Sequence, residues 1–86
     1  MPALPVVHDV DDVDHWLQSP KRKELMGPRG YTVRTFVDPT DPNRVGLVVD
    51  GATLQDFEEL MKSSEALDAV KYDGVRADTI RVLEER

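Results

Sequence analysis

The fold is decided by three consecutive segments: Tyr31-Thr-Val-Arg-Thr-Phe-Val37, Asp38-Pro-Thr-Asp-Pro-Asn43 and Arg44-Val-Gly-Leu-Val-Val-Asp-Gly51. The first and third are rich in β-branched residues and alternate with a period of two, which predicts strands over 31–37 and 44–49. The middle segment combines prolines with side chains that form local turns, so it predicts an exposed loop. The centre of the chain is therefore predicted to be a β-hairpin.

The sequence before this hairpin predicts a strand followed by a helix. Residues 4–10 place Val6, His8 and Val10 on one strand face, as expected for a strand with one buried face. Asp11 is a suitable N-cap for the helix, because a carboxylate suits the positive end of the helix dipole. The neighbouring acidic residues could also form a cation site, but the ligand spacing and glycine turn of a calcium loop are missing.

Within this first helix, Val13, Trp16 and Leu17 share one face, which predicts that all three point toward the core. Ser19-Pro20 then interrupts the pattern. Because Ser is a good N-cap and Pro a good first helical residue, a second helical segment is predicted over 20–26. A Gly-Pro pair ends it.

The sequence after the hairpin predicts a two-part helix and a last strand. Thr53 and Asp56 have the spacing of a capping box. An apolar stripe follows at Leu54, Phe57, Leu60 and Met61, and Leu67 and Val70 continue it after a second start at Ser63-Ser64. Asp73-Gly74 predicts the end of the helix, and residues 79–83 alternate as a strand.

The predicted order is β-α-β-β-α-β within a single domain that spans residues 1–86. Such a chain most simply folds as an α+β, ferredoxin-like domain: an antiparallel sheet with strand order 4-1-3-2 and the helices on one face. The other face would carry Arg34, Phe36, Val48 and Leu83, an apolar surface that a monomer should not expose. We therefore expect a homodimer that forms through this open sheet face.

Composition excludes several functions. The net charge of −6 and the pI near 4.7 oppose nucleic-acid binding, and the basic cluster Lys21-Arg22-Lys23 is predicted to be a solvated helix face. The chain has no Cys and no zinc-type spacing, so neither a disulfide nor a structural metal is expected. The longest apolar run, 46–49, is too short to span a membrane, and the expected location is the cytoplasm.

Parts of the sequence resemble a known superfamily. They are Val13-Asp-His-Trp-Leu17, Asp38-Pro-Thr-Asp-Pro-Asn-Arg-Val45 and Phe57-Glu-Glu-Leu-Met-Lys-Ser-Ser-Glu-Ala-Leu-Asp-Ala-Val-Lys-Tyr-Asp-Gly-Val75. In these segments the chain resembles small bacterial proteins of the dimeric α+β barrel superfamily, which includes antibiotic-biosynthesis monooxygenases and cyclase-like proteins. The resemblance implies a ferredoxin-like barrel formed by two subunits, but these features belong to the scaffold and do not specify a reaction.

The resemblance also implies which residues would carry out a reaction. Cofactor-free monooxygenases of the superfamily are associated with an Asn, Trp and Arg set, for which Trp16 and Arg34 are available. The only Asn, Asn43, lies at the hairpin tip and is explained as a turn residue. Haem-degrading relatives need a His ligand; His8 and His15 exist, but His15 is expected to face water. We expect neither a cofactor nor a metal.

The residues themselves give a short set of candidates. His8 is the only titratable group among the apolar residues of its strand face, which makes it a candidate acid/base; a partly buried structural His is the alternative. Arg34 either pairs with an acidic group or lines a wet cavity, because burying it unpaired would be costly. The ligand-binding candidates are Trp16, Tyr31, Phe36 and Tyr72, for which core or boundary roles are the structural alternative.

The sequence thus predicts a protein that binds a small apolar or aromatic molecule in a cavity between sheet and helices. The resemblance implies that any chemistry would be monooxygenase-like or cyclase-like. The alternative is a non-catalytic assembly or regulatory module whose open sheet face is its working surface. No nucleophile elbow, phosphate loop or metalloprotease pattern occurs in the chain.

Overall fold

The computed structural model describes residues 3–85, in which the predicted order of elements is found and each helical region is divided in two. The strands are β1 Ala3–Val10, β2 Thr32–Val37, β3 Arg44–Asp50 and β4 Val75–Val82. The helices are α1 Val13–Gln18, α2 Lys21–Met26, α3 Leu54–Leu60 and α4 Ser64–Tyr72, and a 3₁₀ turn, Gly27–Arg29, follows α2. Within these residues, no helix is long and apolar enough to cross a membrane.

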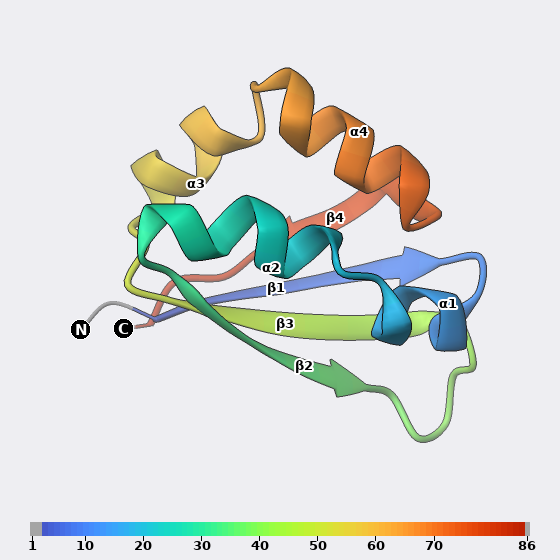
Figure 1. Ribbon diagram of the computed structural model, residues 1–86. Coiled ribbons are helices and arrows are strands. Elements are labelled where there is room, and N and C mark those ends of the chain that lie inside the picture. Colours follow the sequence, from blue (N-terminus) through green and yellow to red (C-terminus); the bar gives the residue numbers. More distant parts are fainter. Residues whose placement is uncertain (1–2, 86) are drawn as a thin grey trace.

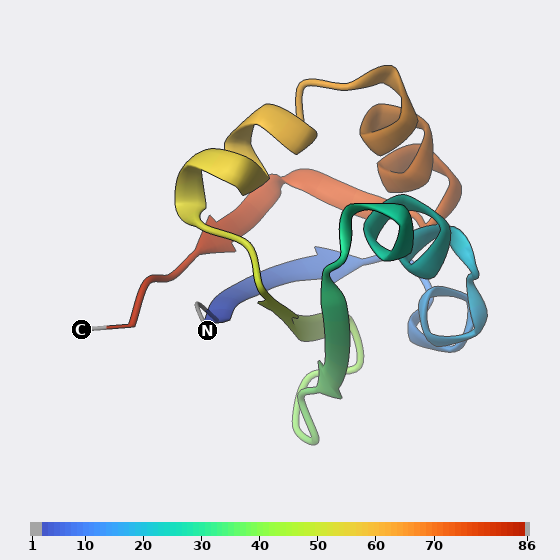
Figure 2. The ribbon, with the colours of Figure 1, turned by 60° about the vertical axis from the view of Figure 1, so that its left-hand side comes forward.

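The strands form one antiparallel sheet in the order β2-β3-β1-β4, which is the predicted order read from the opposite edge. Helices α2, α3 and α4 lie over one face of this sheet (Figure 1). A view turned about the vertical axis shows that these helices leave the other face uncovered (Figure 2). The predicted ferredoxin-like α+β fold is therefore confirmed.

The two faces of the sheet differ in burial. The helix-covered face carries Leu4, Val6, His8 and Val10 from β1 and Val45, Leu47 and Val49 from β3, all of them buried. On the open face, Arg34 lies opposite Val48 and Phe36 lies opposite Gly46 in the β2–β3 register. Phe36 is 50% exposed and Val48 is half-buried, so the open face is apolar in part, as the sequence predicts.

Helix capping follows the sequence at α3 and α4 but differs at α1 and α2; α2 begins at Lys21, with Pro20 and not Ser19 in the N-cap position. The Thr53 hydroxyl accepts a hydrogen bond from the Asp56 N–H, and the Asp56 carboxylate accepts one from the Thr53 N–H, so the predicted capping box is present. The first helix is capped by Asp12 rather than by Asp11. Asp11 instead forms an ion pair with Arg76, at 3.0 Å, which ties the start of α1 to β4.

Two helix residues that were predicted to point inward are exposed. Leu67 is 59% exposed, because α4 approaches the core through the small residues Ala66 and Ala69, which are buried beside it. Leu17 is 43% exposed, since the short helix α1 buries a single side chain, Trp16. In both cases the spacing of apolar residues correctly predicts a helix, but fewer of these residues are buried than predicted.

The last strand begins at Val75, not at Thr79. Gly74 has a φ of 68°, a left-handed conformation that glycine adopts readily, and it turns the chain from α4 directly into β4. The register between β1 and β4 then shifts between Val7 and Asp9. This irregularity interrupts the period of two from which the strand start was predicted.

Candidate functional site

A cavity lies between the helices and the covered face of the sheet. Apolar side chains from both layers form most of its lining, among them Val6, Leu47, Leu25, Phe57 and Ala69. The titratable side chains in the lining are His8, Arg22 and Asp73. The cavity volume is ≈ 60 Å³, which is less than half of the ~150 Å³ that holds a benzene ring in an apolar protein cavity. It therefore fits one small group and not a whole ring.

His8 reaches this cavity because it shares its strand face with Val6 and Val10. It is 4% exposed, and its Nδ1 lies 3.4 Å from the Asp9 carbonyl oxygen. Its ring meets Trp16 edge to face, with a centroid distance of 5.6 Å and an interplanar angle of 79°. Burial lowers the pKa of His8 below its ordinary value of 6.5, against a smaller opposing effect of the hydrogen bond to Asp9. The imidazole is therefore neutral at pH 7.

Arg22 and Asp73 form an ion pair in the lining of the cavity. Arg22 Nη1 donates to Asp73 Oδ2 at 3.1 Å, and the two side chains are only 12% and 4% exposed. Arg22 Nη2 donates to the Trp16 carbonyl, and the guanidinium lies over the Trp16 ring, 4.1 Å from its centroid. The prediction of a solvated helix face is therefore wrong for Arg22, because its charge is balanced by Asp73 at the end of α4.

One oxygen of Asp73 remains without a partner. Asp73 Oδ1 is buried and accepts no hydrogen bond from any residue between 3 and 85. Asp9 Oδ1 is also buried without a hydrogen bond, but it lies 3.4 Å from Arg44 Nε in an ion pair. An unsatisfied buried polar atom costs about 1–3 kcal/mol. A donor that reached Asp73 Oδ1, on one of the lining residues, would therefore be stabilising.

Two of the predicted site residues, His8 and Trp16, are brought together at this cavity. Arg34 is not, because it lies on the open face and pairs there with Asp50 at 3.0 Å. Phe36 also lies on the open face. Tyr31 packs at the edge of the core just before β2, as a boundary residue would.

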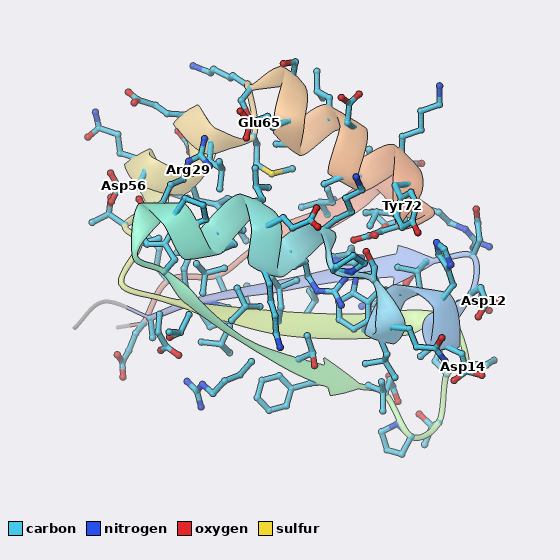
Figure 3. The ribbon with its side chains drawn as sticks, viewed as in Figure 1. Asp12, Asp14, Arg29, Asp56, Glu65 and Tyr72 are labelled. Carbon is cyan, nitrogen blue, oxygen red and sulfur yellow. The ribbon has the colours of Figure 1, made fainter. Side chains whose placement is uncertain are left out.

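Tyr72 lies outside the cavity, at the end of α4 (Figure 3). It is 50% exposed, and its ring is flanked by His15, at a centroid distance of 5.1 Å, and by the Lys21 ammonium. His15 Nε2 donates to the Tyr72 carbonyl at 2.8 Å, so His15 is exposed as predicted but also holds α1 against α4. Within the described chain, no His, Asp and Glu side chains gather into a group of three that could hold a metal ion.

Sequence reasoning missed Arg22 and Asp73. Arg22 stands between Lys21 and Lys23, and Asp73 stands in an Asp-Gly helix end, so each has a sufficient local explanation. The signal that was available is the position of Arg22 six residues after Trp16, since arginine often stacks on an aromatic ring. That signal is weak without knowledge of the fold.

Comparison with known proteins supports the fold and goes no further. No protein-family model matches the sequence, and no curated protein matches it significantly. Among solved structures, the chain is similar to an antibiotic biosynthesis monooxygenase, with a TM-score of 0.60 and 15% identity over 100% of this chain and 99% of the other. It is also similar to a candidate antibiotic biosynthesis monooxygenase from Nitrosomonas europaea, with a TM-score of 0.65 and 14% identity over 100% and 97% of the two chains.

A third similar structure is a designed protein without natural ancestry, Ferredog-Diesel, with a TM-score of 0.52 and 18% identity over 98% of this chain and 85% of the other. The chain thus has the ferredoxin-like α+β fold of the antibiotic biosynthesis monooxygenase-like proteins, as the resemblance in its sequence implies. Because a designed protein shares the same architecture, the fold does not identify an activity.

Proposed function

We propose that this protein binds a small molecule with an apolar body at the cavity between sheet and helices, and that His8 is its acid/base group. The observation that carries this proposal is a neutral His8 buried among apolar side chains, with its Nε2 bonded to none of the described residues. A neutral imidazole in such a place can accept a proton from a ligand hydroxyl or from an activated C–H group. Monooxygenase-like or cyclase-like chemistry would begin with such a proton transfer.

The size of the cavity limits how a ligand binds. A volume of ≈ 60 Å³ receives the polar end of a ligand. The remainder of the molecule would lie at the mouth of the cavity or widen it by moving flexible side chains such as Met26 and Met61. The ligand is therefore small or has a narrow end.

Trp16 provides a direct test of binding. It is the only Trp of the chain and it lines the cavity, so its fluorescence reports on this site alone. A ligand that enters beside His8 should change the emission of Trp16 in a saturable way and should raise the melting temperature. No response to any member of a library of small phenols, benzyl alcohols and enolisable ketones would contradict the proposal.

The acid/base role of His8 is tested by substitution. With a converted substrate in hand, His8→Ala should lower turnover by about 10²–10⁴-fold, because that is the usual cost of removing a general acid or base. A matched control is His15→Ala, which removes the other imidazole outside the cavity. Unchanged turnover in His8→Ala would show that another group carries the chemistry and would contradict the acid/base role of His8.

A second candidate function is assembly through the open sheet face. Phe36 favours it, because its ring is 50% exposed and lies opposite Gly46, which has no side chain to cover it. We propose that this face meets the same face of a second copy in an isologous homodimer. A purely structural or regulatory module would form that dimer and give no response in the Trp16 assay, whereas a ligand-binding dimer would show both.

A further inference from the structure

We propose that the ligand of this cavity is a hydrogen-bond donor: a neutral or cationic molecule that presents a hydroxyl or amino group on an apolar body. The inference rests on the proposed function, since it names the chemical class that the same cavity would accept. It depends on two acceptor atoms that belong to residues lining the cavity, Nε2 of His8 and the buried Oδ1 of Asp73.

The first acceptor is Nε2 of His8. The partner of Nδ1 is the Asp9 carbonyl oxygen, which can only accept a hydrogen bond. Nδ1 therefore carries the proton of the neutral imidazole, and Nε2 is left with a free lone pair. A ligand group that meets Nε2 must bring a hydrogen.

The second acceptor is Oδ1 of Asp73. Its sister oxygen, Oδ2, already accepts from Arg22, and Oδ1 has no donor among the described residues. The side chain is 4% exposed, so bulk water does not readily replace the missing donor. A carboxylate oxygen in this position is stabilised by an O–H or N–H group and repels a second anion.

The charge around these acceptors argues in the same direction. Arg22 is the cation of the lining, but it donates to Asp73 and to the Trp16 carbonyl, and its flat face is packed against the Trp16 ring. Its charge is thus already balanced by Asp73 within the protein. A carboxylate or phosphate ligand would have to compete with Asp73 for Arg22, whereas an alcohol or an amine would leave the ion pair intact.

A set of benzyl compounds isolates the donor group. Benzyl alcohol and benzylamine carry a donor, benzyl methyl ether blocks it, toluene lacks it, and benzoate replaces it with an anion. We expect the alcohol and the amine to bind about tenfold or more tightly than the ether, because a hydrogen bond to a charged group usually contributes that much. Benzoate should bind most weakly. Titration of Trp16 fluorescence, with excitation outside the absorption of the ligands, gives each Kd.

The outcomes separate this inference from the proposed function. If toluene and the ether bind as tightly as the alcohol, or if benzoate binds more tightly, the donor preference is overturned while binding at the cavity survives. If no member of the set binds, the proposed function fails and the inference fails with it. If the cavity holds only an ordered water that no ligand displaces, no member of the set will bind, and both proposals fail.

A pair of variants locates the preference. Asp73→Asn keeps the shape but weakens one acceptor, so the ratio between alcohol and ether affinities should fall to within about threefold. Asp68→Asn changes an exposed acidic residue of the same helix and should leave the ratio unchanged. An unchanged ratio in a folded Asp73→Asn protein would overturn the role of Asp73. The benzyl set on the wild-type protein decides the donor preference even where Asp73→Asn fails to fold.

Discussion

Asp73 accepts a hydrogen bond of 3.1 Å from Arg22 across 51 positions of sequence, and this contact joins α2 to the end of α4 beside the cavity. The pair is almost completely buried, so neither charge can be hydrated if its partner is removed. The same pair leaves one Asp73 oxygen without a donor. One ion pair thus contributes both to the stability of the helix layer and to the polarity of the candidate site.

Removal of Arg22 should be severe. Arg22→Ala leaves the Asp73 carboxylate buried and unpaired, and we expect a loss of about 3–5 kcal/mol in the free energy of unfolding. Chemical denaturation measures it. The control is Glu65→Ala, which removes the exposed pair between Arg29 and Glu65 (Figure 3), whose nitrogen and oxygen lie 4.0 Å apart. That change should cost less than about 1 kcal/mol. Similar losses in both variants would show that Arg22 and Asp73 are not buried as described.

Stability should depend on His8 below about pH 6.5. Because the pKa of His8 is lower in the folded protein than its ordinary value of 6.5, the unfolded chain binds the proton more tightly. The contribution of His8 to stability is therefore fully present above that pH and is lost as the pH falls through the folded pKa. The charged groups that act on His8 are Arg22, Asp9 and Asp73, of which Arg22 opposes protonation and the two carboxylates favour it.

The variant His8→Gln, which cannot titrate, isolates this effect. Between about pH 7.5 and pH 5, the wild type should lose more stability than His8→Gln does, as measured by urea denaturation at each pH. His15→Gln, which changes the other imidazole of the chain, is measured alongside so that the effect of His8 is separated from that of His15. Parallel curves for wild type and His8→Gln would contradict the burial of a neutral His8.

The open sheet face should hold two copies together. Phe36→Asp would place carboxylates in the proposed interface, where burying one Phe contributes about 2–3 kcal/mol, so we expect dissociation or unfolding. Size-exclusion chromatography with light scattering should give the wild type near twice its chain mass of 9.7 kDa. The control Leu67→Asp changes another exposed apolar residue, which lies on the helix layer, and should stay dimeric. A monomeric wild type would contradict the assembly.

Gly74 should be required for its backbone conformation. Its φ is 68°, and an added Cβ would contact Asp11 at an ordinary distance of 3.5 Å, so the cost of Gly74→Ala is conformational rather than steric. We expect a loss of about 1 kcal/mol. Gly74→Asn is the control, because Asn adopts the left-handed conformation more readily than Ala, and it should lose less stability than Gly74→Ala. A thermal melt distinguishes the two variants.

The sequence predicted the fold because its strongest signals are local. The strand period of the central hairpin, the Thr53–Asp56 capping box and the glycine at position 74 each specify an element within a few residues. Where local signals failed, a distant contact was responsible. Ala66 and Ala69 let α4 approach the core closely and leave Leu67 exposed. The irregular register opposite Val7 and Asp9 interrupts the strand pattern, so the start of β4 was predicted too late in the chain.

The candidate site was predicted only in part for the same reason. His8 and Trp16 could be identified because each is unusual within its own element. Arg22 and Asp73 are ordinary within theirs, and only the packing of α2 against α4 makes them a buried pair. Arg34 was predicted as a site residue because burying its charge unpaired would be costly. In the structure it lies on the open face, where an ion pair with Asp50 balances this charge.

The central claim, that the cavity beside His8 receives a ligand, is tested most directly by NMR. Isotope-labelled protein is titrated with benzyl alcohol, and the shifts of backbone amides and of the Trp16 indole N–H are followed to saturation. We expect the largest changes at Trp16, His8 and Asp73, with little change at Phe36 and Val48. Changes confined to the open sheet face, or no saturable change at all, would contradict the claim.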